Sequence, residues 1–299
     1  MRSKKIAVLF AILAAALYAI NIPISKILLE NVNATMMAAF LYLGAGMGML
    51  LYQMGYKALG GAAQKEPLTR AELPYTVAMV VLDIFAPILL MLGVSRTNSA
   101  NASLLNNFEI VATSVIALVI FKELISKKLW LAIGLVTLAS VVLSFEGNGA
   151  LEFNAGSLFV LGACICWGFE NNCTKMLSKK SSEEIVIIKG CFSGLGSLVV
   201  ALIIGESVPA FSWMLAVLLL GFVSYGLSIN FYIMAQSSLG AAKTSAYYAI
   251  APFLGVAFSM LLLGERPGVQ FYLAMGIMIV STVLMIKDTL ESDEDGGEE

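Results

Sequence analysis

Three acidic residues, Asp83, Glu109 and Glu170, stand inside long apolar runs of the sequence. An acid at the centre of a membrane span costs roughly 2.5–3.5 kcal/mol, so such residues are candidates for function rather than for structure alone. One possible role is to bind and release a proton, because a low-dielectric cavity favours the neutral carboxyl form. The other is to pair with a cationic substrate or with an internal base.

Four lysines are candidates for such a base: Lys26, Lys175, Lys189 and Lys243. Each lies within a turn or two of the end of an apolar run, where a long side chain can extend to the membrane surface. The sequence therefore favours a role as topology anchors for these lysines, and pairing with the acids stays open as the alternative.

Polar and small side chains recur every three or four residues around two of the acids, so they share a helix face with Glu109 or Glu170. Asp83 has only apolar neighbours and no such stripe. Stripes of this kind point either into a water-filled cavity or into close helix contacts. For a cavity, the stripes and mid-span aromatic residues predict a wall that contains Tyr18, Asn21, Asn106, Trp167, Asn171, Thr174, Tyr225, Ser228 and Tyr248.

The elements that must hold these residues are membrane helices. The chain of 299 residues is 59% hydrophobic and only 13% charged, with a mean hydropathy of +0.89, whereas a soluble domain carries about 25% charged residues. Apolar runs of about 20 residues can span a bilayer. We therefore expect an all-α integral membrane protein with ten spans, near residues 6–29, 33–56, 73–94, 100–121, 129–146, 155–177, 184–205, 212–236, 241–263 and 269–287.

The sequence contains an internal repeat. Residues 14–26 align with residues 163–175, and residues 100–144 align with residues 242–286, an offset of 142 that places Lys122-Glu123 on Gly264-Glu265. Spans 1–5 thus repeat as spans 6–10, and because five is odd the two copies cross the membrane in opposite directions. The expected organisation is a first repeat at 1–149, a second at 150–287, and an acidic, disordered cytoplasmic tail at 288–299.

Lysine and arginine residues gather in the loops on one side of the predicted membrane region. This bias predicts that both termini are cytoplasmic in a multi-pass protein of the plasma (inner) membrane. The formal net charge is −2, but the tail alone carries seven acids, so the membrane body has 13 acids and 18 bases. Those bases are scattered along one membrane face, which gives no indication of nucleic-acid binding.

Several classes of chemistry are excluded by composition. The chain has no histidine, and its four cysteines all lie in predicted spans without a C-x-x-C motif. This removes Ser-His-Asp and Cys-His catalysis and most zinc sites. The loops are also too short to hold an active site. We expect neither an enzyme nor catalytic residues, and no cofactor or metal.

The two five-span halves, the W-G…K pattern of Trp167, Gly168 and Lys175, and the paired span ends Phe121-Lys122-Glu123 and Leu263-Gly264-Glu265 complete the pattern. With these features the sequence resembles the drug/metabolite transporter superfamily and, within it, the ten-span EamA-type carriers, from Lys5 to Lys287. It departs from the family where Lys122 replaces a frequent glycine and Tyr18-Ala19 replaces a frequent Trp-Gly.

The resemblance implies a carrier that alternates access around one central cavity and commonly exports metabolites or amphipathic compounds. We therefore expect a secondary-active exporter of a small molecule, coupled to protons through Glu109 or Glu170. An uncoupled facilitator, an exchanger or a channel-like protein stays open as the alternative. The expected partners are a small-molecule substrate, membrane lipid and protons, with the chain as a monomer or weak homodimer.

Overall fold

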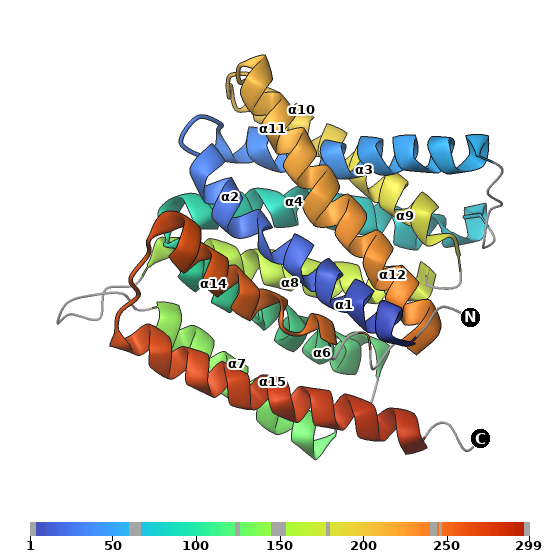
Figure 1. The fold of residues 1–299 in the computed structure, drawn as a ribbon. Helices are drawn as coiled ribbons and strands as arrows, with labels where there is room; N and C mark the ends of the chain where they lie inside the picture. Colours follow the sequence, from blue (N-terminus) through green and yellow to red (C-terminus); the bar gives the residue numbers. More distant parts are fainter. Residues whose placement is uncertain are drawn as a thin grey trace.

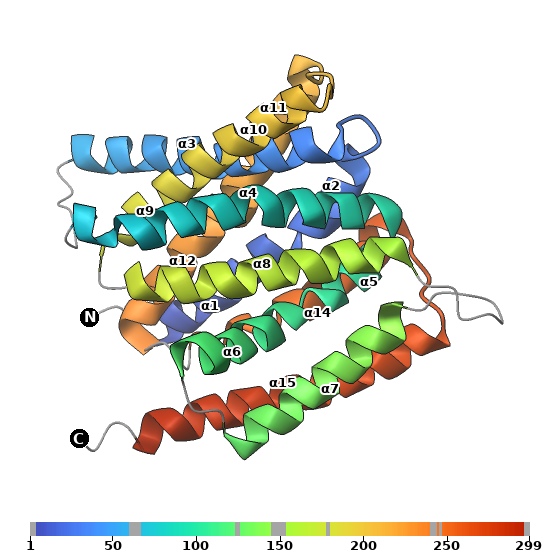
Figure 2. The same ribbon diagram turned by 180° about the vertical axis from the view of Figure 1, so that it is seen from behind.

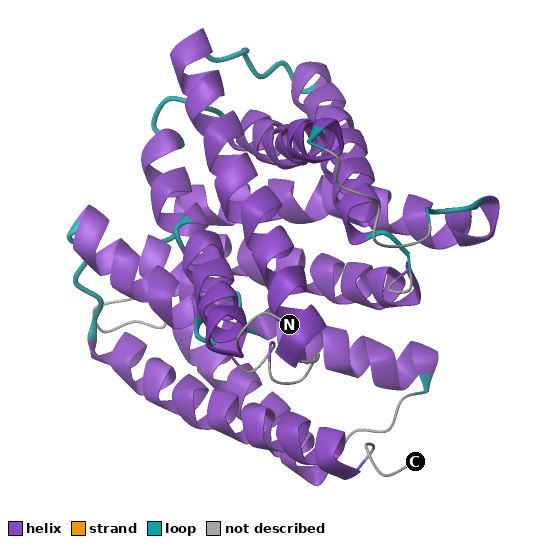
Figure 3. Cartoon of the chain, turned by 45° about the vertical axis from the view of Figure 1, so that its right-hand side comes forward, coloured by secondary structure: helices purple, strands orange, loops and turns teal. Residues whose placement is uncertain are grey.

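The computed structural model of the chain is all-helical in the residues that it describes, which are 4–59, 67–122, 126–144, 154–177, 180–239, 244 and 247–295 (Figure 1). Short loops join the helices (Figure 3). Their bounds are α1 Lys4–Ala19, α2 Asn21–Leu28, α3 Ala34–Ala58, η1 Arg70–Glu72, α4 Leu73–Arg96, α5 Ser99–Leu105, α6 Phe108–Phe121, α7 Lys127–Ser144, α8 Ala155–Leu177, α9 Ser182–Ile188, η2 Lys189–Ser193, α10 Gly194–Ile203, α11 Phe211–Gly221, η3 Phe222–Leu227, α12 Ser228–Leu239, α14 Ala251–Leu263 and α15 Val269–Asp295.

These elements form ten helical segments in the described part of the chain, one at each predicted span, which confirms the predicted fold class. Seven of the described helices are long and apolar enough to cross a membrane, and α14 is a shorter apolar helix. Large apolar side chains such as Leu51, Ile203 and Leu261 are exposed on the outside. Such a surface suits contact with lipid, whereas in water it would be an aggregation hazard.

Three spans are interrupted within their length. The first is broken between α1 and α2 at Ile20, where Pro23 has no N–H to donate to the carbonyl four residues earlier. The second break, between α5 and α6, falls at Asn106-Asn107, where the Asn107 amide donates to the Leu104 carbonyl at 3.2 Å and so competes with the helix. The third precedes α14, which has Pro252 in its first turn. Broken helices of this kind commonly form the binding sites of transporters.

Two further spans contain π-helical segments, η2 and η3, each of which packs closely on α3. Glycines allow the approach. A Cβ at Gly221 would stand 2.0 Å from the Leu41 carbonyl oxygen, and one at Gly190 would stand 2.4 Å from the Gly46 nitrogen. Because a π-turn shifts the register of the residues around it, these segments redirect side chains and are frequent at functional sites.

The repeat predicted from the sequence extends to backbone conformation. With the offset of 142 residues, Lys122 corresponds to Gly264. Each is the C-cap of its helix and each is left-handed, with φ of 57° and 64° respectively. Glycine adopts this conformation readily and lysine does not, so Lys122 retains the backbone geometry of a helix end despite its side chain.

Helix α3 contacts α4, α10, α11 and both π-segments. Helices α7 and α15 pack against each other at one edge (Figure 1 and Figure 2), joined by a hydrogen bond of 2.8 Å from the Ser281 hydroxyl to the Ala132 carbonyl. Helix α1 begins and α15 ends on one side of the molecule, called here the termini side. The opposite side, which holds the loops at 29–33, 97–98, 204–210 and 264–268, is called the far side.

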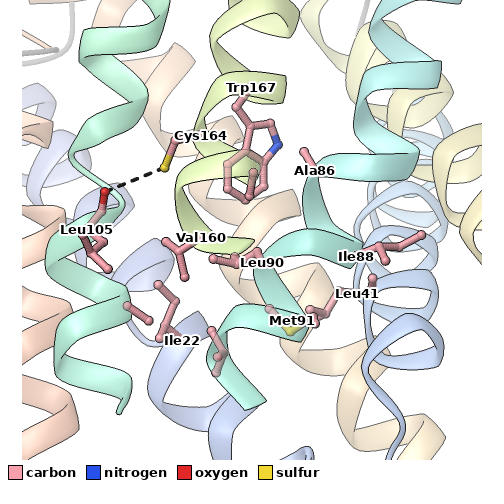
Figure 4. Close-up of a cluster of buried hydrophobic side chains, with 14 of the residues drawn as sticks. Ile22, Leu41, Ala86, Ile88, Leu90, Met91, Leu105, Val160, Cys164 and Trp167 are labelled. Atoms are coloured by element: carbon pink, nitrogen blue, oxygen red, sulfur yellow. Dashed lines mark hydrogen bonds between the residues drawn. The ribbon is translucent and has the colours of Figure 1, made fainter. Parts of the chain in front are cut away.

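The apolar core of α2, α3, α4, α5 and α8 is shown in Figure 4. Leu90 and Met91 follow Asp83 by about two turns on α4, and Val160 precedes Trp167 by about two turns on α8. Because α4 and α8 run in opposite directions, Leu90, Met91 and Val160 all lie closer to the far side of the molecule than Asp83 and Trp167 do. A compact hydrophobic cluster therefore separates those polar residues from the far side.

Helix α15 continues to Asp295, so it does not end at Lys287 as the sequence analysis predicts. The extension covers most of the acidic segment that we expected to be disordered. Residues 288–295 contain no glycine or proline, and the first glycine of the segment is Gly296, so nothing in the local sequence stops the helix. The last four residues, 296–299, lie outside the described part of the chain.

Candidate functional site

A cavity of about 530 Å³ lies where the broken helices and the π-segments meet. Its volume is in the range of sites that hold small molecules, about 300–1,000 Å³. Both repeats contribute to the wall, which consists of Tyr18, Tyr42, Ala45, Asn106, Asn107, Glu109, Ile110, Trp167, Glu170, Asn171, Thr174, Val186, Lys189, Gly190, Tyr225, Ile229, Tyr232, Tyr248, Ala249, Ala251 and Pro252.

A buried ion cluster stands at one side of this cavity. The Lys189 ammonium lies 3.1 Å from a carboxylate oxygen of Asp83 and 3.1 Å from one of Glu170. Asp83 is fully buried and Glu170 is 1% exposed. Two carboxylates share one ammonium, so the cluster carries one net negative charge when all three groups are ionised.

The remaining oxygens of the two carboxylates also have hydrogen-bond partners. The Tyr42 hydroxyl and the Trp167 indole N–H donate to Asp83 Oδ1 at 3.0 and 3.1 Å, and the Thr174 hydroxyl donates to Glu170 Oε1. A buried charge is tolerated only when it is paired and hydrogen-bonded. The cluster therefore joins α3, α4 and α8 to η2 through polar contacts.

Glu109 lies apart from this cluster, on the cavity wall in the first turn of α6. Its carboxylate accepts a hydrogen bond of 2.8 Å from the Asn171 amide, which also donates to the Thr113 hydroxyl at 3.2 Å. Among the described residues, no lysine or arginine forms an ion pair with Glu109. The α6 N-terminus supplies a partial positive charge there, but no cationic side chain of the described residues contacts this carboxylate.

Five tyrosines of the wall form a continuous series of ring contacts. Tyr42 contacts Tyr225, with centroids 5.4 Å apart, and Tyr225 contacts Tyr18 edge-on at 5.8 Å. Tyr18 contacts Tyr248 at 6.0 Å, and Tyr248 contacts Tyr232 edge-on at 5.2 Å. The π-segment η3 carries Tyr225, as η2 carries Lys189, so the two rewound helices supply an aromatic and a charged group to one cavity.

Most residues that the sequence indicates for the wall line this cavity: Tyr18, Asn106, Glu109, Trp167, Glu170, Asn171, Thr174, Tyr225 and Tyr248. Asn21 and Ser228 do not, because both are buried in helix contacts. The Asn21 amide donates to the Tyr225 hydroxyl at 3.0 Å, and the Ser228 hydroxyl donates to the Ala14 carbonyl at 2.9 Å. In these two cases the polar stripe serves helix packing.

Asp83 is also absent from the cavity wall and reaches the site through Lys189, Tyr42 and Trp167. Sequence reasoning missed Tyr42, which has no distinctive spacing, whereas Tyr232 lies on the same helix face as Tyr225 and Ser228 and lines the cavity as that spacing indicates. It also favoured an anchor role for Lys189, which is wrong, because that ammonium meets two carboxylates inside the protein. The sequence does contain a signal for this pairing, because acids inside a membrane require a cation and Lys189 stands two turns into its span.

The other three candidate lysines behave differently. The Lys26 ammonium donates to the carbonyls of Val94 and Thr97, both at 2.6 Å, at the C-terminal end of α4, where a cation suits the exposed carbonyl groups. Lys175 is exposed at the end of α8. Lys243 lies outside the described residues.

An all-helical chain with an apolar surface and a charged cavity between two matched halves has the architecture of a multi-pass membrane carrier. The chain belongs to the EamA-like transporter family, whose model matches it twice, at residues 5–145 and 154–287. The protein is thus a transporter of the drug/metabolite transporter superfamily, an integral membrane protein and not an enzyme, which confirms the resemblance predicted from the sequence.

One relative with a curated description is an "Uncharacterized transporter" of Methanothermobacter thermautotrophicus, 24% identical over 291 residues, which cover 92% of this chain and 84% of the relative. The fold is also similar to a protein of known crystal structure, with a TM-score of 0.66 and 15% identity, over 94% of this chain and 96% of that one. At this identity the structural similarity establishes the fold alone.

Within the described part of the chain, cysteine, aspartate and glutamate side chains do not form any group of three or more that could hold a metal ion. The chemistry that the cavity offers is therefore that of its carboxylates, its ammonium group, its amides and its tyrosines. These groups can bind charge, exchange protons and stack on an apolar or aromatic ligand.

Proposed function

We propose that the protein is a secondary-active transporter that exports a small metabolite or amphipathic compound by alternating access, driven by protons. The observation that carries this proposal is the unequal closure of the central cavity: polar contacts between the two halves join them on the far side, while the wall extends toward the termini side. The resemblance to export carriers supports the direction of transport.

The far-side contacts use two glutamates of the second half. The Glu265 carboxylate accepts hydrogen bonds from the backbone N–H groups of Ser99 and Ala100 at 2.7 and 2.8 Å, at the start of α5. The Glu206 carboxylate accepts from Thr35 and Met36 at 3.3 and 2.7 Å, at the start of α3. Both satisfy helix N-termini that would otherwise have unpaired donors, so both hold the halves together.

Toward the termini side, the cavity wall includes Thr174 near the end of α8 and Val186 near the start of α9. Because these positions lie close to the termini-side ends of their helices, the cavity extends in that direction. The lysine and arginine bias supports a cytoplasmic location for this side in the plasma (inner) membrane. The conformation then faces the cytoplasm and could load a substrate for export.

The cluster of Asp83, Lys189 and Glu170 supports proton coupling. With one net negative charge, it becomes neutral when it binds one proton, and a neutral cluster costs less free energy to bury. Of its two carboxylates, only that of Glu170 lines the cavity, so Glu170 is the group that can exchange a proton with water there. Protonation would loosen the contact with Lys189 and hence the contact of α8 with η2.

The alternatives make different demands on the structure. An open channel needs a continuous path, and the apolar cluster of Figure 4 together with the Glu206 and Glu265 contacts argues against one on the far side. A facilitator or an exchanger fits the same cavity, but it does not need a charged cluster that one proton neutralises. We keep a monomer or weak homodimer as the proposed assembly.

Reconstitution into proteoliposomes tests the proposal. Purified protein is placed in vesicles with a trapped pH-sensitive dye, and amines, amino acids, nucleosides and polyamines are added in turn. A proton-coupled carrier moves protons when one of these compounds is added, and Glu170→Gln abolishes the response while an exposed control variant, Glu30→Gln, keeps it. Compound flux that is indifferent to a pH gradient would reject the coupling and favour a facilitator.

A further inference from the structure

The cavity has an excess of negative charge. In the described part of the chain, its ionisable wall residues other than tyrosines are Glu109, Glu170 and Lys189, and Asp83 stands directly behind Lys189. Three carboxylates therefore face one ammonium group. Even when the cluster of Asp83, Lys189 and Glu170 binds one proton and becomes neutral, the negative charge of Glu109 remains.

Glu109 is positioned to receive a ligand. Asn171 donates to only one of its oxygens, at 2.8 Å, and the carboxylate lies on the cavity wall without an ion-pair partner among the described residues. The Asn171 amide also donates a hydrogen bond of 3.2 Å to the Thr113 hydroxyl, which fixes its orientation. The carboxylate is thus oriented by its surroundings while its charge is left for a cation from outside.

The aromatic wall suits the same kind of ligand. The Tyr18 hydroxyl accepts a hydrogen bond of 3.1 Å from Asn106, which stands three residues before Glu109, and both Tyr18 and Glu109 line the cavity. Tyr18 is the middle member of the series of ring contacts that includes Tyr225 and Tyr248. Tyrosine faces attract cations by about 0.5–2 kcal/mol each, and they also pack against apolar groups.

Anionic and zwitterionic ligands fit poorly. A carboxylate or phosphate needs a cationic partner, and among the described residues the wall offers Lys189 alone. That ammonium already holds two carboxylates at 3.1 Å. A ligand carboxylate would bring a third negative charge to a single ammonium group away from bulk water, and the repulsion between like charges makes this unfavourable.

We propose that the cavity selects a monocationic organic amine with an aromatic or other apolar body, and that Glu109 is the specificity-determining residue that pairs with its ammonium group. This inference rests on the proposed function in one respect, since it takes the central cavity as the transport site. It assigns Glu109 to the substrate and leaves the proton to the cluster around Glu170.

Binding to the purified full-length protein in detergent tests this assignment by isothermal titration. The probe is phenyltrimethylammonium, whose charge does not depend on pH. The comparison ligands share its ring: phenylalanine is a zwitterion, phenylacetate is an anion and benzyl alcohol is neutral. Wild-type protein is expected to bind the cation at least about tenfold more tightly than any of the three, as a charged pair away from bulk water implies.

Variants of single residues test which side chain pairs with the cation. Glu109→Gln, which can still accept from Asn171, is expected to weaken binding of the cation by about tenfold or more, and Glu109→Asp to retain part of the affinity. Glu30→Gln, which removes an exposed glutamate, should bind as the wild type does. Thermal melting of each variant verifies that it is folded.

Wild-type binding of phenylacetate or phenylalanine as tight as that of phenyltrimethylammonium would overturn the proposal, and this comparison requires no variant. Unchanged affinity in folded Glu109→Gln would also overturn it. The two proposals can be rejected separately. If the wild type shows no proton response in vesicles, proton coupling is rejected but the binding result for the cation is unaffected. If protons move only with neutral compounds, the cation site is rejected but the proposal of a proton-coupled carrier is not.

Discussion

Lys189 and Asp83 form an ion pair of 3.1 Å between η2 of the second repeat and α4 of the first. Lys189 also pairs with Glu170, so replacing Lys189 and replacing Asp83 have different consequences. Replacement of Lys189 leaves two buried carboxylates without a cation, whereas replacement of Asp83 by asparagine leaves a balanced pair of Lys189 and Glu170.

We therefore expect Lys189→Met to lower stability by about 3–5 kcal/mol, the usual effect of removing one member of a buried pair. Asp83→Asn should cost much less, since it removes the surplus charge and keeps a hydrogen-bonding group. Melting temperatures in detergent measure both, with the exposed Lys57→Met as a control. A larger loss for Asp83→Asn than for Lys189→Met would show that the cluster is not charged as described.

The far-side closure gives a second prediction. Each of Glu206 and Glu265 caps a helix of the other repeat, and removal of a capping group costs about 0.5–2 kcal/mol. Glu265→Ala should therefore shift the population toward the outward-facing state by about fivefold, since about 1 kcal/mol corresponds to that factor.

Maleimide labelling of a cysteine placed at the buried Ser103 position measures this shift from the far side. Ser103 lies on α5, whose start Glu265 caps. The labelling rate should rise in Glu265→Ala and stay constant in Glu30→Ala, which alters an exposed glutamate. An unchanged rate in the Glu265 variant would mean that this contact does not hold the far side closed.

A third prediction concerns the repeat itself. Lys122 and Gly264 both adopt left-handed conformations, with φ of 57° and 64°. Lys122→Gly should raise stability by about 0.5–1 kcal/mol because glycine relieves the conformation. Gly264→Ala should lower it by about 1–2 kcal/mol. The two melting temperatures should move in opposite directions, and a fall in both would contradict the shared geometry.

The fourth prediction tests the close packing that positions the π-segments. A Cβ at Gly221 would stand 2.0 Å from the Leu41 carbonyl oxygen, whereas one at Gly276 would meet nothing within 4 Å. Gly221→Ala should cost about 1–3 kcal/mol or more, the usual effect of overpacking. Gly276→Ala should be close to neutral or stabilising, since alanine favours a helix. Equal melting temperatures for the two variants would reject the tight contact of η3 with α3.

Much of this molecule could be predicted from its sequence, because hydropathy and repeats are local patterns. The spans, the repeated halves and the stripe of Trp167, Glu170, Asn171 and Thr174 depend only on spacing along one helix. The partner of Asp83 could not be predicted in this way. Lys189 comes from a different helix, and it enters the cavity because glycines let a π-turn pack against α3.

The spacing of polar residues along a helix does not predict the positions of Asn21 and Ser228 correctly. Both have the spacing of cavity residues, but whether a polar stripe faces a cavity or a neighbouring helix depends on which helix lies opposite. Here α1 lies against α12 and η3, and α2 reaches η3 through the hydrogen bond from Asn21 to Tyr225, so both side chains are used in helix contacts. The tail differs for another reason: helix propensity carries α15 past Lys287, although acidic composition favoured disorder.

The measurement that tests the central claim most directly is made on two variants in the same vesicles. Amine-driven proton movement is recorded with a trapped pH-sensitive dye for Glu170→Gln and for Glu109→Gln, alongside binding of phenyltrimethylammonium to each purified protein. Glu170→Gln should move no protons, and Glu109→Gln should bind the cation about tenfold or more weakly than the wild type does. Proton movement at the wild-type rate in Glu170→Gln would contradict the division of roles between the two carboxylates.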